Sequence, residues 1–283
     1  MVDFEALRYS KAQALPEVPT RMTSSVEPEF SSRKAARRAL RRLQCELMDA
    51  QSRLFARRDS SLLLILQGMD TSGKDGLIRH VFRQVSPVGL QVHSFGPPSE
   101  PETHDHFLAR YRRALPKPGY ISVFNRSYFE QLMYLRVHPE LRPRAVTATE
   151  AAAEVRAICE FERALPKQGV TVIKVFLHIC KAKQKKRLLS RATAPEKNWK
   201  LRRADLTDHR MWDQHYRAFQ EAMDQTDFDA APWFVVPADD KWAARYWVAL
   251  LILQTLEHLA PEYPKPDLRK RSLIRDVCLT LSQ

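Results

Sequence analysis

The sequence predicts a three-layer α/β/α fold in which helices cover both faces of a parallel sheet of five strands. Three observations predict it. Apolar runs of strand length recur along the chain, helical patterns separate them, and the first of these runs leads into a glycine loop, residues 68–74. Strands that alternate with helices are joined by right-handed crossovers and therefore form a parallel sheet. With 283 residues, 44% of them hydrophobic, the chain can bury one large α/β core.

The first 31 residues are rich in Pro, Ser and Thr and lack clear periodicity, so residues 1–31 are expected to be an N-terminal arm, extended on the surface or partly disordered. Residues 32–283 are expected to form a single domain. It begins with a helix over 32–58, because leucines share one stripe of that segment. Its first turns carry six basic residues: Arg33, Lys34, Arg37, Arg38, Arg41 and Arg42. This cluster indicates either a solvated face or a contact with a polyanion or a second subunit.

The loop after the apolar run 62–66 fills the GxxxxGK frame of a phosphate-binding P-loop. In such a loop, backbone N–H groups and a helix N-terminus bind phosphate oxygens, and the lysine reaches the outer phosphates. Three of the seven glycines lie here (Gly68, Gly73 and Gly76), which argues against an accidental turn. The residues expected to contact phosphate are Gly68, Met69, Thr71, Ser72, Gly73, Lys74 and Asp75.

Two carboxylates distinguish this loop from a common P-loop. Asp75 stands where a Ser or Thr hydroxyl usually binds Mg²⁺, and Asp70 lies inside the loop. Negative charge beside phosphate is repulsive unless a cation lies between the two, so we interpret Asp70 as a metal ligand.

The remaining strands are predicted over 90–95, 119–127, 170–179 and 232–238, with helices over 102–115, 147–165 and 241–259. The third strand ends in Asn125 and Arg126. At the mouth of the loop, Arg126 can bridge donor and acceptor phosphates, or it can form a structural ion pair. Asn125 cannot act as a strong base, and Glu130, if it lies in a helix that follows, can supply the missing carboxylate.

The segment 181–230 is longer than a crossover needs and is predicted to be a basic lid module. Within 181–210 there are eleven basic residues and only three acidic ones. A mobile basic segment beside a P-loop can close over phosphates and exclude water, whereas the alternative is an ordinary amphipathic helix with a charged face. Trp199 and Trp212 can stack on a base or pack the lid helices.

The balance of 46 Lys and Arg against 33 Asp and Glu, a net charge of +13, predicts a polyanionic partner such as a nucleotide, nucleic acid, anionic lipid or phosphate polymer. The four cysteines form no CxxC pair, which argues against zinc and against a disulfide framework and favours the cytoplasm. No apolar stretch approaches about 18 residues, so the sequence predicts no membrane span. Four histidines are interpreted as surface or core side chains: His93, His104, His106 and His138.

Four segments together resemble the polyphosphate kinase 2 family over roughly residues 30–260: GMDTSGKDG, FNRSYFE, PEKNWK and APWFVVPADDKWAAR. The resemblance implies a P-loop kinase fold similar to that of thymidylate kinases, with a helical lid. It implies transfer of phosphoryl groups between inorganic polyphosphate and nucleotides (AMP, ADP and ATP), with Mg²⁺ or Mn²⁺, in a homodimer or homotetramer.

The resemblance also implies roles for individual residues. Asp70, Lys74 and Arg126 are expected to be catalytic on this ground, and Glu130 is expected to be catalytic as the carboxylate that Asn125 lacks. Asp70 is expected to bind metal, and Glu130 is expected either to bind metal or to orient the acceptor phosphate. Further phosphate contacts are expected from Arg126 and from the lid residues Arg187, Arg191, Lys197 and Lys200.

Asn125 and Glu130 depart from the commoner family pattern, in which Asp and Asn occupy these two positions. The Asn/Glu combination resembles the subgroup that phosphorylates both nucleoside monophosphates and diphosphates, with Asn125, Arg126 and Glu130 at the nucleotide acceptor. Two other functions fit the P-loop and the charge. One is an ATP-dependent kinase of a non-nucleotide small molecule, and the other is a basic nucleic-acid-binding protein, although no known nucleic-acid motif is visible.

Overall fold

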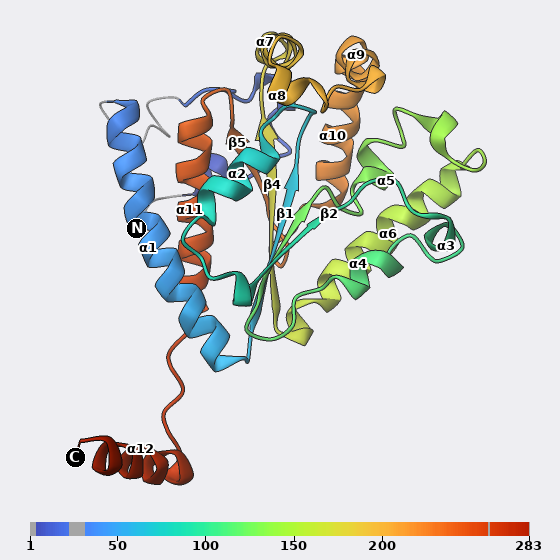
Figure 1. Ribbon diagram of the computed structural model, residues 1–283. Coiled ribbons are helices and arrows are strands. Elements are labelled where there is room, and N and C mark those ends of the chain that lie inside the picture. The colour runs from blue at the N-terminus through green and yellow to red at the C-terminus, as the bar shows by residue number, and fades with distance from the viewer. Residues whose placement is uncertain (1–3, 23–31, 260, 283) are drawn as a thin grey trace.

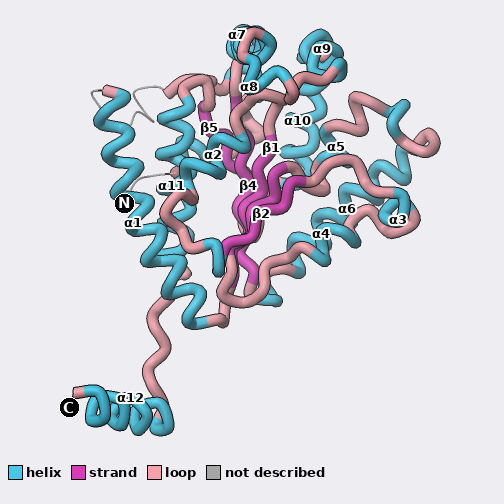
Figure 2. Tube along the Cα trace, in the orientation of Figure 1, coloured by secondary structure: helices cyan, strands magenta, loops and turns pink. Residues whose placement is uncertain are grey.

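The computed structural model describes residues 4–22, 32–259 and 261–282. Five parallel strands form one sheet in the order β2-β3-β1-β4-β5, with helices on both faces (Figures 1 and 2). The strands are β1 (Ser61–Gln67), β2 (Leu90–Ser94), β3 (Ile121–Asn125), β4 (Val170–His178) and β5 (Trp233–Pro237). The predicted α/β fold with a five-stranded parallel sheet is confirmed.

The central strand β1 places the P-loop. All seven of its residues are buried, as expected for a parallel strand covered on both faces. It pairs with β3, where Leu66 lies opposite Asn125, and with β4, where Gln67 lies opposite Phe176. Because the strands run in the same direction, their carboxyl ends meet at one edge of the sheet. The loop after β1 therefore lies beside Arg126, which follows β3.

One face of the sheet is covered by α1 (Arg33–Arg57), α2 (Lys74–Val81) and α11 (Lys241–His258). Helix α11 packs against both α1 and α2 and lies between α1 and the sheet (Figure 1). This position explains why α11 is apolar around nearly its whole circumference, since a helix that is buried on all sides has no solvent face to keep polar.

The other face carries α4 (Ala109–Arg113), α5 (Glu130–Met133), α6 (Ala148–Ala164) and α10 (Trp212–Thr226) (Figure 1). The prediction of one helix over 102–115 is wrong. The chain forms a short helix α3 (Glu100–Thr103), and α4 starts only after an irregular segment. The Thr103 hydroxyl bonds to the Glu100 carbonyl (2.6 Å), and His106 Nδ1 accepts from the Leu108 N–H (3.3 Å), so side chains replace helical backbone bonds there.

Helices α7 (Lys181–Ala192), α8 (Pro195–Asn198) and α9 (Arg203–Arg210) lie above the carboxyl edge of the sheet (Figure 1). They hold the basic part of the segment predicted as a lid. Helix α10 differs from them because its side chains Trp212, Phe219 and Met223 are buried in the core. The segment 181–230 thus divides into a basic cover over the sheet edge and a helix of the body.

The described part of the N-terminal arm packs along β5. It contains two 3₁₀ turns, η1 (Glu5–Leu7) and η2 (Leu15–Glu17), and buries Leu7 and Leu15. The Tyr9 N–H donates to the Trp233 carbonyl at 2.9 Å. Residues 4–22 are therefore joined to the core, which their composition did not indicate. Residues 1–3 and 23–31 of the predicted arm lie outside the described residues.

The last helix, α12 (Leu268–Leu281), lies apart from the rest of the chain, beyond an extended segment (Figure 1). None of its described residues is buried. Further 3₁₀ turns are η3 (Pro87–Gly89), η4 (Pro139–Leu141) and η5 (Pro166–Gln168). Of the helices formed by described residues, none has the length and apolar character needed to cross a bilayer.

Candidate functional site

The loop between β1 and α2 has the backbone of a phosphate-binding loop. Gly68, Thr71 and Gly73 have φ angles of 141°, 66° and 112°, in the region that favours glycine. A Cβ at Gly68 would lie 2.8 Å from the Leu177 carbonyl oxygen of β4, so this position also needs glycine for space. Gly73 is the N-cap of α2, and the first N–H groups of a helix have no partner within it. These groups are therefore available to an anion in the loop.

Lys74 folds back over the loop. Its Nζ donates to the carbonyl oxygens of Gly68 (2.7 Å) and Met69 (3.4 Å), and the residue is buried. Burial lowers the pKa of Lys74 to about 8, and the positive charge of Arg126 adds to this effect. Within the described part of the chain, the ammonium thus donates to neutral carbonyls alone, and a phosphate would give it a stronger partner.

Asp70 and Arg126 form the centre of the site. Arg126 Nη2 donates to Asp70 Oδ1 at 2.5 Å, and Arg126 Nη1 donates to Glu130 Oε2 at 3.3 Å. The other oxygen of Asp70 accepts from Arg202 Nη2 at 3.2 Å. Burial raises the pKa of Asp70, but the charges of Arg126, Lys74 and Arg202 outweigh burial and lower it, so this carboxyl is ionised.

The backbone of Arg126 is strained. Its φ of 65° is uncommon for a residue with a side chain and costs on the order of 1–3 kcal/mol. Its N–H still bonds to the Leu66 carbonyl at the end of β1 (3.1 Å). Such strain is typical of functional positions, and here the turn after β3 directs the guanidinium to Asp70 in the P-loop.

Asp75 accepts hydrogen bonds from two residues that were also predicted as site residues, Asn125 and Lys200. Its Oδ1 accepts from Asn125 Nδ2 at 3.0 Å, and its Oδ2 accepts from Lys200 Nζ at 3.1 Å. Burial raises the pKa of Asp75, but the hydrogen bonds from Asn125 and Lys200 outweigh it and lower the pKa. Asn125 therefore donates to a carboxylate at the mouth of the loop, and Lys200 links that carboxylate to the lid.

Arg187 has a different environment from the one its predicted phosphate contact requires. It donates to the carbonyls of Thr71 and Ser72 (2.9 and 2.8 Å) and of Ala238 and Asp239 (2.6 and 3.0 Å). Four carbonyl partners favour a positioning role, in which Arg187 ties the P-loop to the end of β5. Its contact with phosphate stays a prediction.

Arg191 and Lys197 of the lid line a cavity above the P-loop. Arg191 Nη1 lies 3.5 Å from Asp205 Oδ2, and Lys197 pairs with Glu196 at 2.8 Å. Trp199 is 74% exposed beside this cavity, whereas Trp212 is buried in stacking contact with Tyr216, their centroids 4.5 Å apart. Trp212 is therefore a core residue, and only Trp199 remains free to meet a ligand.

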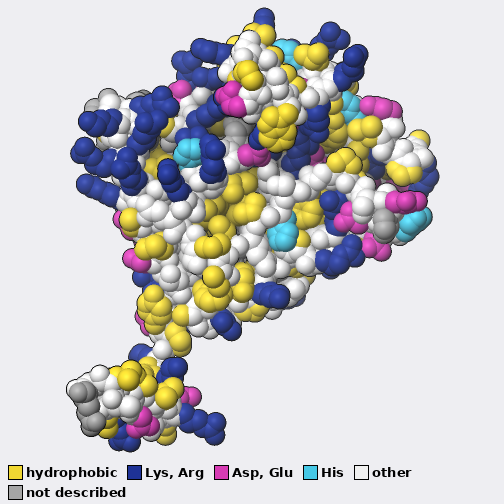
Figure 3. All heavy atoms as spheres, in the orientation of Figure 1, with side chains coloured by type: hydrophobic (Ala, Val, Ile, Leu, Met, Phe, Trp, Pro, Cys, Tyr) yellow, Lys and Arg dark blue, Asp and Glu magenta, His cyan; other side chains and the backbone are white. Residues whose placement is uncertain are grey.

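Residues 70–77 of the loop and α2, Arg126, Glu130 and the lid residues Arg187, Arg191, Lys197 and Lys200 line one cavity of about 2520 Å³, whose walls also include α1 and α11. Pockets for one small molecule usually measure about 300–1,000 Å³. Lys and Arg side chains gather on its α1 side and over the lid helices, and apolar side chains lie between these two areas (Figure 3). The cavity thus has room for a nucleotide together with a longer anion.

The donor atoms at the mouth of the cavity fit a divalent cation, which phosphoryl transfer generally needs. The hydroxyls of Thr71 and Ser72 and the amide oxygen of Asn125 are buried and, among the described residues, have no hydrogen-bond partner. The carboxylates of Asp70, Asp75 and Glu130 line the same cavity. Carboxylate, hydroxyl and amide oxygens, with phosphate and water, are the ligands that Mg²⁺ and Mn²⁺ prefer.

Further cationic residues line the cavity beyond the site residues predicted from the sequence. Arg202 pairs directly with Asp70, although it was counted only in the charge of the lid. A second group comes from α1, α2 and α11. It comprises Arg33, Arg37, Arg41, Arg79, Arg83 and Arg245. The basic first turns of the 32–58 helix were the available signal for this group, but the sequence could not show that they face the P-loop.

Comparison with known proteins identifies the family. The family model described as "Polyphosphate kinase 2 (PPK2)" matches residues 30–264. The chain is 40% identical to the ADP-polyphosphate phosphotransferase of Rhodopseudomonas palustris (88% of this chain, 90% of that protein) and 40% identical to the AMP/ADP-polyphosphate phosphotransferase of Meiothermus ruber (86% and 89%). The crystal structure of polyphosphate kinase 2 from Arthrobacter aurescens TC1 superposes with a TM-score of 0.88 at 35% identity and covers 96% of both chains. The chain is a member of the polyphosphate kinase 2 family.

Proposed function

We propose that this chain transfers phosphoryl groups between inorganic polyphosphate and nucleoside monophosphates or diphosphates, from AMP to ADP and from ADP to ATP. One observation carries the proposal: the cavity above the P-loop continues along a row of arginines to α1. A nucleotide kinase that uses ATP needs room for two nucleotides, whereas the side chains that line this extension are mainly cationic. A linear phosphate polymer matches such a track.

The arginine row supplies the donor side of the proposal. Within the described part of the chain, Arg33, Arg37, Arg79 and Arg245 form no ion pair with a carboxylate. Burial lowers the pKa of Arg245, and repulsion from Arg79, Arg33 and Arg37 lowers it further. Uncompensated positive charge of this kind is relieved by a polyanion. We infer that the polyphosphate chain runs from the P-loop along α2 toward α1.

The acceptor nucleotide is proposed to bind on the opposite side of the P-loop, where Asn125, Arg126 and Glu130 line the cavity. Arg126 would exchange Asp70 for a phosphate oxygen and neutralise the charge shared by donor and acceptor. Lys74 would hold the phosphoryl group that moves, and the lid would exclude water. Phosphoryl transfer through a loose transition state needs mainly such alignment and charge neutralisation, so no covalent enzyme intermediate is required.

The metal is proposed to be Mg²⁺ or Mn²⁺. Asp70 and Glu130 would hold it, with Asp75 next to them. When bound, the ion neutralises phosphate charge during transfer. Both oxygens of Asp70 are paired with Arg126 and Arg202 in this state. We therefore propose that these two guanidiniums turn from Asp70 to phosphate when substrates enter, which frees the carboxylate.

Further proposals concern organisation. Residues 32–259 would act as one catalytic domain, with 181–210 as the part of the lid module that moves and 4–22 as an attached arm. Four free cysteines and nucleotide substrates favour a cytoplasmic location.

A homodimer or homotetramer is supported by α12, because its exposed apolar residues include Leu273 and Ile274 (52% and 47% exposed). Removal of residues 261–283, followed by light scattering, tests whether this helix holds the subunits together.

The deciding experiment is a nucleotide panel. AMP and ADP are incubated separately with polyphosphate and Mg²⁺, in both directions, and products are separated by chromatography. The proposal expects ADP from AMP, ATP from ADP, and no product with Lys74→Ala. ATP consumption that ignores polyphosphate would favour the small-molecule kinase instead. Salt-sensitive binding to nucleic acid without any phosphoryl transfer would favour the nucleic-acid-binding alternative.

A further inference from the structure

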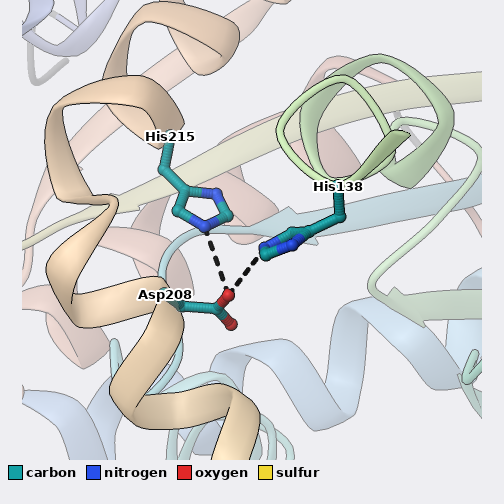
Figure 4. A group of neighbouring side chains, drawn as sticks. All are labelled: His138, Asp208 and His215. Atoms are coloured by element: carbon teal, nitrogen blue, oxygen red, sulfur yellow. Dashed lines mark hydrogen bonds and ion pairs between the residues drawn. The ribbon is translucent and has the colours of Figure 1, made fainter. Parts of the chain in front are cut away.

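Three buried side chains behind the lid converge on one point: His138, Asp208 and His215 (Figure 4). Their exposed fractions are 5%, 3% and 2%. His138 precedes η4, Asp208 lies in the last turns of α9, and His215 lies in the first turn of α10. From the sequence, His138 is interpreted as a surface or core histidine because no HxxxH spacing occurs there. Its two partners in the cluster lie some 70 or more positions further along the chain.

The geometry of this cluster leaves one nitrogen without a hydrogen bond. His138 Nε2 lies 2.8 Å from Asp208 Oδ1, and His215 Nε2 lies 3.4 Å from the same oxygen. All three ligand atoms are within 4.8 Å of one another. His215 Nε2 is fully buried and has no hydrogen-bond partner among the described residues. Native proteins rarely bury a polar atom without a partner, so this atom needs one.

A carboxylate lies beside each ring nitrogen of His138. Glu140 Oε1 lies 3.0 Å from His138 Nδ1 and can hold the ring proton there when the imidazole is neutral. The lone pair of His138 Nε2 then faces a carboxylate oxygen at 2.8 Å. Two acceptors at this distance repel each other unless a proton or a cation lies between them. A carboxylate that orients the far nitrogen of a histidine is also the usual outer support of a metal-binding imidazole.

We propose that His138, Asp208 and His215 bind a divalent transition-metal ion, with Zn²⁺ as the best match. Zinc takes histidine nitrogens at about 2.0–2.1 Å and carboxylate oxygens at about 2.0–2.2 Å, so its tetrahedral ligand atoms lie roughly 3.3–3.5 Å apart. The two nitrogen-to-oxygen spacings of 2.8 and 3.4 Å in the cluster are close to this value, and the two imidazole nitrogens lie within 4.8 Å of each other. Two imidazoles with one carboxylate favour zinc over Mg²⁺, which prefers oxygen ligands.

The proposed ion would position the lid. It would tie the corner between α9 and α10 to the segment after α5, the helix that begins at Glu130. The N-cap of α9 is Arg202, whose guanidinium contacts Asp70. A bound ion would therefore fix the end of α9 opposite the one that reaches the P-loop. This role is separate from the cation expected at the phosphates and does not depend on the proposed function.

The test uses the full-length chain, stripped of metal by a chelator and then titrated with Zn²⁺ alone against a chromophoric competitor. We expect one zinc ion per chain, resistance to excess Mg²⁺, and a visible absorption band of tetrahedral type when Co²⁺ replaces zinc. His215→Gln and His138→Gln should abolish this binding. Glu140→Gln should weaken it roughly 10–100-fold, as is usual for outer supports. The matched control is His209→Gln, which lies on α9 next to Asp208 and should bind like the wild type.

Two results would overturn the proposal. One is wild-type protein that retains no zinc beyond the level of His215→Gln, in which case protonated histidines hold the cluster together. The other is zinc retained equally by His215→Gln and His138→Gln, which would place the ion elsewhere. If a variant does not fold, X-ray absorption at the zinc edge of the wild type decides the matter. It should show two imidazole ligands, and their absence would equally overturn the proposal.

Discussion

Two ion pairs of this chain use the same chemistry in different surroundings. In the core, Lys174 of β4 pairs with Glu162 of α6 at 2.7 Å, and neither side chain has exposed surface. In the candidate site, Arg126 pairs with Asp70 at 2.5 Å, with 25% and 14% of the side chains exposed. Both pairs join a residue on or just after a strand to an acid, and both are surrounded by aromatic or charged side chains.

The core pair is closed. Lys174 Nζ also donates to the Thr226 carbonyl (2.6 Å), and the Tyr128 hydroxyl donates to the second oxygen of Glu162 (2.7 Å). The rings of Phe129, Phe228 and Trp233 lie 4.9–5.3 Å from the ammonium. Burial raises the pKa of Glu162 and lowers that of Lys174, so each charge depends on the other. The charged atoms of this pair are therefore bonded within the protein and offer no hydrogen-bonding position to a ligand.

The site pair is open. It faces a cavity of about 2520 Å³, includes a third charge in Arg202, and starts from a residue with strained backbone. Under the proposed function, Arg126 and Arg202 would exchange Asp70 for phosphate, and Asp70 would exchange the two guanidiniums for a metal ion. The comparison teaches that burial alone does not separate a structural ion pair from a functional one. What separates them is whether the partners are fully satisfied within the protein.

The largest expected effect is on activity. Arg126→Ala should lower kcat by about 10³–10⁵-fold, because a guanidinium that neutralises the charge of the phosphoryl group in the transition state typically contributes that much. The unfolding free energy should change by less than about 1 kcal/mol, since Arg126 is part-exposed and its turn is strained. Steady-state kinetics and urea unfolding check both. The matched control is Arg136→Ala, which removes an arginine paired with Glu221 outside the cavity. A loss of stability that accounts for the loss of activity would make the site pair structural.

The second effect is on stability. Glu162→Ala leaves the Lys174 ammonium buried and unpaired, so the unfolding free energy should fall by about 3–5 kcal/mol. The double substitution Glu162→Leu with Lys174→Met removes both charges and should recover most of this loss. Glu221→Ala, at an exposed pair, should cost about 0–1 kcal/mol. Urea unfolding of the wild type and these three variants measures the differences in unfolding free energy. A double variant no more stable than Glu162→Ala would contradict the interpretation of a closed pair.

A third, smaller effect is on pH dependence. The pKa of Lys74 is lowered to about 8, so its charged form is lost as the pH rises through 8. Since phosphate binding needs that charge, kcat/KM should fall above pH 8, approaching tenfold per pH unit. The free energy of unfolding changes in the opposite direction. Burial of the charged ammonium lowers it fully below pH 8, and this loss disappears as the pH rises from 8 to 10.5, so the protein becomes more stable over that range. Lys74→Arg should lack the alkaline fall, because arginine stays charged. The same fall in Lys74→Arg would assign it to another group.

Much of the fold follows from local patterns. The apolar runs fixed all five strands to within a few residues, since a strand buried on both faces leaves a continuous apolar signal. The P-loop was found because glycine geometry restricts its sequence. The single helix predicted over 102–115 is wrong because side-chain bonds of Thr103 and His106 interrupt the segment, and such bonds are not periodic.

The site was only partly predictable. Motifs pointed to Asp70, Lys74 and Arg126, and the structure brings these three together. The partners from distant segments were not predictable, since a pair such as Arg202 and Asp70 depends on how the lid folds over the sheet edge. The same holds for Arg187, whose positive charge suggested a phosphate ligand but whose donors reach four carbonyls. Charge can be read from a sequence, but the partner that satisfies it cannot.

The smallest expected effect concerns the arginine row, where the comparison can be extended beyond single pairs. Arg37→Gln with Arg41→Gln removes two cations of α1 that line the cavity. If the polymer lies along α1, the KM for long polyphosphate should rise several-fold while the KM for a short chain changes little. The dependence of log KM on log salt should become shallower by roughly one for each phosphate contact removed. The matched control is Arg53→Gln with Arg57→Gln, at the other end of α1 and outside the cavity. An equal rise in KM for both chain lengths would place the polymer elsewhere, because only a track that extends past the reacting phosphates can distinguish long donors from short ones.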